Sequence, residues 1–213
     1  MTPFPALRLI SLGFISLLAA VGLSSCGTDT SLFGSGGDAR NKMIVSVRDQ
    51  KMLLVRDGTP VKSYKISTSK FGVGDRPGSN CTPLGRLQVA KKIGDNAAMG
   101  SVFKARRATG EVIKPNSPGR DPVVTRIMWL TGTEIRNHNA FKRTIYIHGT
   151  PEERRLGTPA SYGCIRMGSR DVADLYARIS KGADVFIIRG SIQTGKPDSA
   201  AASTVKTLFP SRS

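Results

Sequence analysis

The stretch IYIHGTPEERRLGTPASYGCIRM, residues 145–167, decides how the rest of this chain can be interpreted. It opens with a β-branched and aromatic run, typical of a strand, that ends at His148 and Gly149. A polar loop follows and closes with SYGCIR, residues 161–166. His148 and Cys164 lie 16 positions apart, so only the fold can bring them together. Because a thiol needs a base to become a nucleophile, the stretch predicts a histidine that activates a cysteine.

The residues beside Cys164 suit acyl transfer. Gly163 permits a tight backbone turn next to the sulfur, where the amides of Gly163 and Cys164 can face a developing oxyanion. Arg166 adds a fixed positive charge that suits a carboxylate on a substrate.

Together these residues resemble the L,D-transpeptidase catalytic domain family of the YkuD type. That family has His-Gly or His-Ser at a strand end, then Ser-x-Gly-Cys followed by Ile or Val and by Arg or Asn. His148-Gly149 and residues 161–166 are similar to this signature, and TPLG at residues 82–85 is a second landmark. The resemblance extends from Lys42 to Ile188. One position departs from the pattern, because Tyr162 stands where the family commonly has histidine.

The resemblance implies an enzyme that acts on peptidoglycan stem peptides without a cofactor or a metal. Cys164 would attack the carbonyl that joins diaminopimelate to the terminal D-alanine of a tetrapeptide. His148 would be the base, and the Gly149 carbonyl would orient its ring. Arg166 would hold either a substrate carboxylate or a structural acid. The expected oxyanion-hole and substrate-binding residues are Ser161, Tyr162, Gly163 and Arg166.

Several outcomes stay open for the acyl group. A second diaminopimelate as acceptor gives a cross-link, a lysine of an envelope protein gives protein anchoring, and water gives L,D-carboxypeptidase action. A cysteine peptidase of wall peptides would share the same chemistry. A catalytically silent lipoprotein that binds the wall is the alternative outside enzymology.

The first 26 residues have the pattern of an export signal. Arg8 precedes an almost wholly apolar run from Leu9 to Leu23, and LSSC, residues 23–26, resembles a bacterial lipobox. Cys26 would then be the lipidated first residue of an envelope protein that faces the periplasm or the wall, anchored without a spanning helix. An uncleaved signal anchor is the alternative.

The composition favours a polyanionic neighbour, since the formal net charge of the 213 residues is +17. The bacterial wall and anionic lipid both qualify. No nucleic-acid-binding motif is found, so we expect no nucleic-acid partner. The chain has two histidines and dispersed acids, and His138 lies in a polar loop, so the sequence predicts no metal site.

The hydrophobic pattern predicts a mostly β fold, an L,D-transpeptidase-like sandwich or barrel of antiparallel and mixed strands with one or two short helices. Strands are expected at 43–47, 52–55, 61–68, 86–92, 123–130 and 184–188, and a helix is expected from an N-cap at Ser169. The expected organisation is a signal peptide at 1–26, a tether at 27–41, a catalytic domain at 42–190 and a loosely attached tail at 191–213.

Two further features have more than one interpretation. Residues 93–122 form a long basic excursion with several glycines and prolines, which predicts either a solvated loop with a short hairpin or a lid over the site. Cys81 is expected to be a small, partly buried loop side chain, although a disulfide with Cys164 is conceivable in an oxidising compartment. TPLG is expected to set turn geometry, with proline and glycine fixing the backbone.

Overall fold

The computed structural model describes residues 37–192. The predicted signal peptide and lipobox at 1–26 lie outside these residues, as do most of the predicted tether and of the predicted tail. Within the described part, no helix is long and apolar enough to cross a membrane.

Strands dominate the described residues, which confirms the predicted mostly β fold. One sheet of ten strands is accompanied by one α-helix and two short 3-10 helices. The strands are β1 (Asn41–Ser46), β2 (Lys51–Arg56), β3 (Thr59–Ser67), β4 (Gly85–Ile93), β5 (Ser101–Lys104), β6 (Arg107–Val112), β7 (Val123–Gly132), β8 (Tyr146–Gly149), β9 (Ile165–Met167) and β10 (Asp184–Ile188). The helices are η1 (Ile135–Asn137), η2 (Glu153–Arg155) and α1 (Ser169–Arg178).

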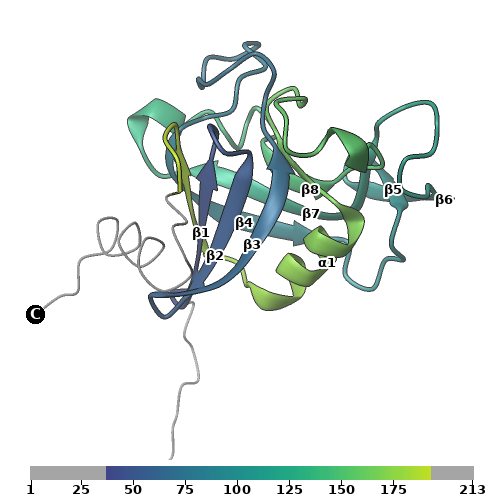
Figure 1. Cartoon of the computed structure of the whole chain (residues 1–213), viewed down its shortest axis with the longest axis horizontal. Helices are drawn as coiled ribbons and strands as arrows, with labels where there is room; N and C mark the ends of the chain where they lie inside the picture. Colours follow the sequence, from purple (N-terminus) through teal and green to yellow (C-terminus); the bar gives the residue numbers. More distant parts are fainter. Residues whose placement is uncertain (1–36, 193–213) are drawn as a thin grey trace, which may run out of the picture. The chain divides into compact units, whose positions relative to one another are not determined.

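The sheet closes on itself. Its order is β4-β10-β1-β2-β3-β9-β8-β7-β5-β6, and β4 also pairs with β7, which joins the first strand of that order to the eighth. Most pairs are antiparallel, but β1–β10 and β8–β9 are parallel, so the barrel is mixed as expected. The β5–β6 hairpin extends from β7 beyond the closed part (Figure 1).

The strand registers define two ends of the barrel. Asn41 at the start of β1 lies opposite Arg56, and the neighbouring Lys42 lies opposite Asp184. At the other end, Ser46 lies opposite both Lys51 and Ile188. The end of β3 reaches this second end too, where Ser67 pairs with Arg166 of β9. We call these the entry end and the site end.

Alternating side chains of β1 and β2 fill two different clusters. Met43, Val45, Met52 and Leu54 point into the main core, whereas Ile44, Leu53 and Val55 pack on the outer face with Ile192. Both faces are apolar because both are covered, which explains the continuous hydrophobic runs. Ile192 lies in the predicted tail, and its side chain is only 5% exposed.

Helix α1 covers part of the barrel next to β7 and β8 (Figure 1). It buries Val172, Leu175 and Tyr176 at helical spacing. The predicted N-cap is wrong, because Gly168 occupies that position and the Glu153 carboxylate accepts the Ser169 amide at 2.8 Å. The Ser169 hydroxyl is used elsewhere, as the acceptor of the Thr125 hydroxyl.

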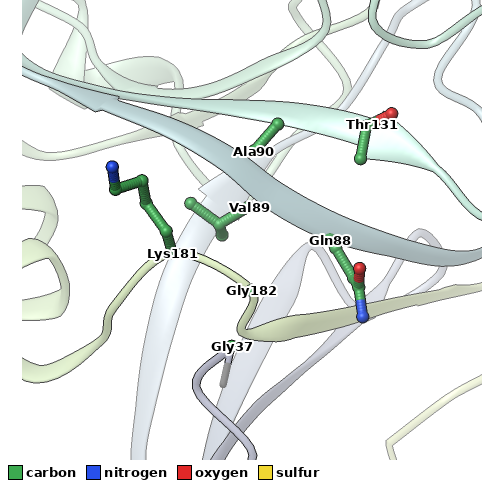
Figure 2. A pocket seen from close by; sticks show the side chains of 7 residues that line it. All are labelled: Gly37, Gln88, Val89, Ala90, Thr131, Lys181 and Gly182. Atoms are coloured by element: carbon green, nitrogen blue, oxygen red, sulfur yellow. The ribbon is translucent and has the colours of Figure 1, made fainter. Parts of the chain in front are cut away.

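The chain enters the domain through a close contact between two glycines. A Cβ on Gly37 would lie 2.9 Å from Cα of Gly182, which has a φ of +86°, so neither position leaves room for a side chain. The Asp38 amide donates to the Lys181 carbonyl at 2.9 Å. A hollow of about 600 Å³ lies beside this contact, bordered by β4, β7 and the turn before β10, as Figure 2 shows.

Candidate active site

Parallel pairing of β8 and β9 brings the two halves of the predicted motif together. Ile147 lies opposite Ile165, and both side chains are buried in the main core. His148 lies opposite Arg166, so these two side chains share the other face of the sheet. Cys164, one position before β9, packs on that same face in a cluster with Tyr146. Cys164 and His148 therefore lie on one face of neighbouring strands.

The His148 ring is buried and held in one orientation. His148 is only 5% exposed, and its Nδ1 lies 2.8 Å from the Gly149 carbonyl oxygen. A carbonyl only accepts, so Nδ1 carries the proton and Nε2 is left with a free lone pair. Gly149 is required by packing, because a Cβ there would lie 2.6 Å from the Val124 carbonyl oxygen.

The thiol of Cys164 is half-buried and weakly contacted. The Tyr146 amide donates to Sγ at 3.4 Å, and Sγ lies 3.5 Å from the Thr144 carbonyl oxygen. Burial raises the pKa of Cys164 to about 11, although the Tyr146 amide and the charges of Arg166 and Arg143 oppose the rise.

His148 responds to burial in the opposite sense. Desolvation lowers the pKa of His148 to about 4, while the Gly149 carbonyl opposes this shift and the charge of Arg166 adds to it. At neutral pH the resting site therefore contains a neutral thiol and a neutral imidazole.

Ser161 shapes the turn that presents the cysteine. Its side chain is fully buried, and its hydroxyl donates to the Cys164 carbonyl at 2.5 Å while it accepts the Gly163 amide at 3.2 Å. Gly163 has a φ of +119°, which a residue with a Cβ would rarely adopt. Within the described part of the chain, the amides of Tyr162 and Cys164 have no hydrogen-bond acceptor.

Thr82 supports this turn from a distant loop, a role that sequence reasoning missed. Its buried hydroxyl donates to the Gly163 carbonyl at 3.0 Å and accepts the Ser69 amide at 3.0 Å. The TPLG motif thus positions the turn at Gly163 and Cys164 through a side chain, beyond the backbone geometry that the sequence predicts. The available signal in the sequence was TPLG itself, which is the second landmark of the family resemblance.

A buried ion pair fixes the same loop. Arg143 lies 2.8 Å from Asp75, with side chains only 8% and 6% exposed. The Arg143 guanidinium also donates to the carbonyl oxygens of Gly74 at 3.0 Å and Cys81 at 2.6 Å. Its partners close the loop against the segment that leads into β8. No motif in the sequence marked this pair.

Arg166 is occupied by acids of the protein. It lies 2.7 Å from Asp121 and 3.7 Å from Glu152, and all three side chains are mostly buried. The sequence left two roles open for Arg166, binding a substrate carboxylate or binding a structural acid. In the structure Arg166 is bound to structural acids. Asp121 lies near the end of the segment 93–122 and also accepts a hydrogen bond from the Thr150 hydroxyl. The C-terminal end of this segment is therefore attached beside the site.

The rest of the excursion covers the same face. Phe103 of β5 is 7% exposed and packs with Ile127 and Tyr146, and Arg106 at the hairpin tip donates to the Tyr146 hydroxyl at 3.3 Å. Arg106 also lies 4.9 Å above the ring of Trp129. The hairpin thus contacts side chains of β7 and β8 on the face that bears His148, through Phe103 and Arg106.

The surroundings of the other singled-out residues are as follows. Tyr162 is 57% exposed, and its hydroxyl accepts from Lys70 at 3.0 Å. Cys81 and Cys164 are both free thiols, so the disulfide alternative is not present, and Cys81 is partly buried as expected. His138 is an exposed loop histidine, also as expected.

Comparisons with known proteins agree with the motif. The family model for the YkuD L,D-transpeptidase catalytic domain matches residues 40–187. Solved L,D-transpeptidases also match. One from Mycobacterium smegmatis has 17% sequence identity and a TM-score of 0.45, and the match covers 70% of this chain and 58% of that one. One from Enterococcus faecium has 19% sequence identity and a TM-score of 0.46, and the match covers 70% of this chain and 50% of that one. L,D-transpeptidase 3 of Mycobacterium tuberculosis has 18% sequence identity and a TM-score of 0.46, and the match covers 70% of this chain and 61% of that one. This chain thus covers about 50–60% of the length of these structures. A comparison with curated proteins gave no match.

Proposed function

Because the chain belongs to the L,D-transpeptidase catalytic domain family, we propose that it is a peptidoglycan L,D-transpeptidase with Cys164 as its nucleophile. One observation supports this most directly: the parallel β8–β9 pair has the Cys164 thiol and the His148 imidazole on the same face. The Gly149 carbonyl leaves Nε2 as the lone-pair nitrogen, which is the form that a general base requires.

In the first half of the reaction, His148 removes the thiol proton and Sγ attacks the carbonyl carbon between diaminopimelate and the terminal D-alanine. A new C–S bond forms, and the carbonyl oxygen becomes an oxyanion. The unpaired amides of Tyr162 and Cys164 are the candidate donors to this oxyanion. The C–N bond then breaks, and D-alanine leaves with the proton that His148 returns.

In the second half, an amine attacks the thioester and gives its proton to His148. The C–S bond breaks, an amide bond forms, and the proton returns to Sγ. A second stem peptide as acceptor gives a wall cross-link, and a protein lysine gives anchoring. Water in place of the amine gives carboxypeptidase action. Arg166, held by Asp121 and Glu152, keeps the excursion attached next to the reacting groups.

Mass spectrometry of purified muropeptides tests this function. The full chain in detergent, incubated with disaccharide-tetrapeptides, should release D-alanine and give products whose masses identify the acceptor. Dimers indicate cross-linking, and tripeptides indicate hydrolysis. The absence of any new product and of any acyl-enzyme mass would contradict the proposal.

Envelope anchoring belongs to the same proposal, with Cys26 as the lipidated residue. Cys26→Ala should shift the protein from the detergent phase to the aqueous phase, or leave an uncleaved precursor, because the lipid would no longer be attached. Detergent phase separation of cell extracts measures this, with Cys81→Ala as the cysteine control. An unchanged partition of Cys26→Ala would contradict the lipid anchor.

Tyr162→Phe should retain most of the activity, with a loss of about tenfold or less, comparable to one hydrogen bond of ~1 kcal/mol. Tyr162 is exposed and its hydroxyl contacts Lys70, so the change removes that contact and leaves the base His148 intact. The rate of thioester formation with a stem tetrapeptide is the measurement. A loss as large as that of His148→Ala would place the phenol in the catalytic machinery.

A further inference from the structure

The cations near Cys164 differ in whether an acid neutralises them. Arg166 pairs with Asp121 and Glu152, and Arg143 pairs with Asp75. Lys70 is different, because it forms no ion pair with any residue in the described part of the chain. Its ammonium group has three hydrogens, of which one is directed at the Tyr162 hydroxyl at 3.0 Å. The remaining two are available to an anion from outside the protein.

Two exposed aromatic rings accompany this lysine. Phe71 is 49% exposed and Tyr162 is 57% exposed, and their ring centroids lie 5.4 Å apart at an angle of 54°. Nζ of Lys70 lies 4.4 Å from the Tyr162 centroid and 5.2 Å from that of Phe71. We call Lys70, Phe71 and Tyr162 the platform. It combines apolar surface with one uncompensated positive charge.

Backbone hydrogen bonds join the platform to the turn at residues 161–164, which presents the proposed nucleophile. Tyr162 itself lies two positions before Cys164, and the Lys70 amide donates to the Ser161 carbonyl at 3.1 Å. Ser69 forms a parallel bridge with Ser161 and donates its amide to Thr82, which in turn holds the Gly163 carbonyl. A ligand on the platform is therefore placed at a fixed position relative to the turn that presents the thiol.

Building on the proposed function, we propose that the platform is a subsite for a carboxylate of the peptide substrate. The Lys70 ammonium pairs with the carboxylate, and the two rings contact the alkyl carbons next to it. Arg166 is already bound to two acids, so the platform supplies the positive charge for a substrate carboxylate, which was one of the two roles that the sequence left open for Arg166. The carboxylate can come from the donor tetrapeptide or from an amino-acid acceptor, and the two sources can be separated by experiment.

The donor arm measures equilibrium binding without chemistry. In the full chain with Cys164→Ala, the affinity for a diaminopimelate-containing tetrapeptide is compared with that for the same peptide with carboxamides in place of its carboxylates. The acceptor arm uses the active protein and compares the rates at which the acyl-enzyme is consumed by D-alanine and by D-alaninamide. Each ratio is measured for Lys70→Met, Lys70→Arg and Phe71→Ser, with Lys51→Met as the exposed-lysine control.

Lys70→Met should reduce the preference for the carboxylate by roughly three- to fivefold in one of the two arms, as expected for an exposed ion pair. That arm identifies the source. Lys70→Arg should keep the preference, Lys51→Met should leave it unchanged, and added salt should weaken it in the wild type more than in Lys70→Met. Phe71→Ser should lower the affinity for both the carboxylate and the carboxamide forms.

The proposal is overturned if Lys70→Met alters neither ratio more than Lys51→Met does. Failure of the proposed function gives a different result: no acyl-enzyme forms in the wild type with any stem peptide. The binding arm still tests the platform in that case, because it does not depend on turnover.

Discussion

Cys164→Ala should reduce acyl transfer to an undetectable level and leave the fold intact. The substitution deletes the one atom that forms the thioester, and no other described thiol lies on the strand face next to His148. The lost contacts of Sγ are long, at 3.4 and 3.5 Å, so the free energy of unfolding should change by only about 1 kcal/mol. Single-turnover acylation followed by intact-protein mass is the direct measurement.

Two further variants sharpen this result. Cys164→Ser should be nearly as inactive, because a neutral imidazole whose pKa is about 4 is too weak a base for a hydroxyl. Cys81→Ala is the matched control, since Cys81 is also a free, partly buried thiol, and it should keep wild-type acylation. Wild-type turnover by Cys164→Ala would show that the nucleophile lies elsewhere.

His148→Ala is expected to slow thioester formation by roughly 10²–10⁴, the contribution of a general base. His148 has its Nδ1 bound to the Gly149 carbonyl, so the loss removes the nitrogen that accepts the thiol proton. His138→Ala is the control, because that histidine is exposed in a loop, and it should act like the wild type. Equal rates for the two variants would contradict the assignment of the base.

The lowered pKa of His148 also predicts a pH dependence. Acylation should hold its rate from neutral pH down toward pH 5 and fall as the pH approaches about 4, where the imidazole becomes protonated. The unfolded chain takes up the same proton at an ordinary pKa of ~6.5, so the free energy of unfolding should decrease as the pH falls through that window. Urea unfolding at pH 7 and pH 4.5 measures this decrease in the free energy of unfolding. The His148→Gln variant should lack the part of the decrease that comes from His148.

Much of the architecture follows from local sequence pattern. Alternating residues located the strand at 61–68, short apolar runs located those near 43–47 and 184–188, and the run before His148 became β8. Strand β9 was not predicted because it has only three residues, Ile165–Met167, too few for any periodicity. The helix cap was predicted wrongly for another reason: the acceptor of the Ser169 amide, Glu153, belongs to η2, 16 positions earlier, where no rule of spacing identifies it.

The contacts that organise the site join residues far apart in sequence. Arg143 pairs with Asp75 across 68 positions, and Thr82 reaches Gly163 across 81. A single sequence contains no information about which arginine meets which acid, so Arg166 was equally compatible with a substrate carboxylate and with Asp121. Residue type and local motif identified the thiol and the imidazole, whereas their supporting residues required the tertiary structure.

The two ends of the barrel separate the point where the chain enters the domain from Cys164. The chain enters at Gly37 beside the entry end, and β1 runs six residues from Asn41 to Ser46, a rise of roughly 20 Å. Cys164 lies at the site end, next to the strand that pairs with Ser67. The described chain therefore begins at the end of the barrel opposite the thiol, and a label or fusion placed directly before Gly37 should leave access to Cys164 unchanged.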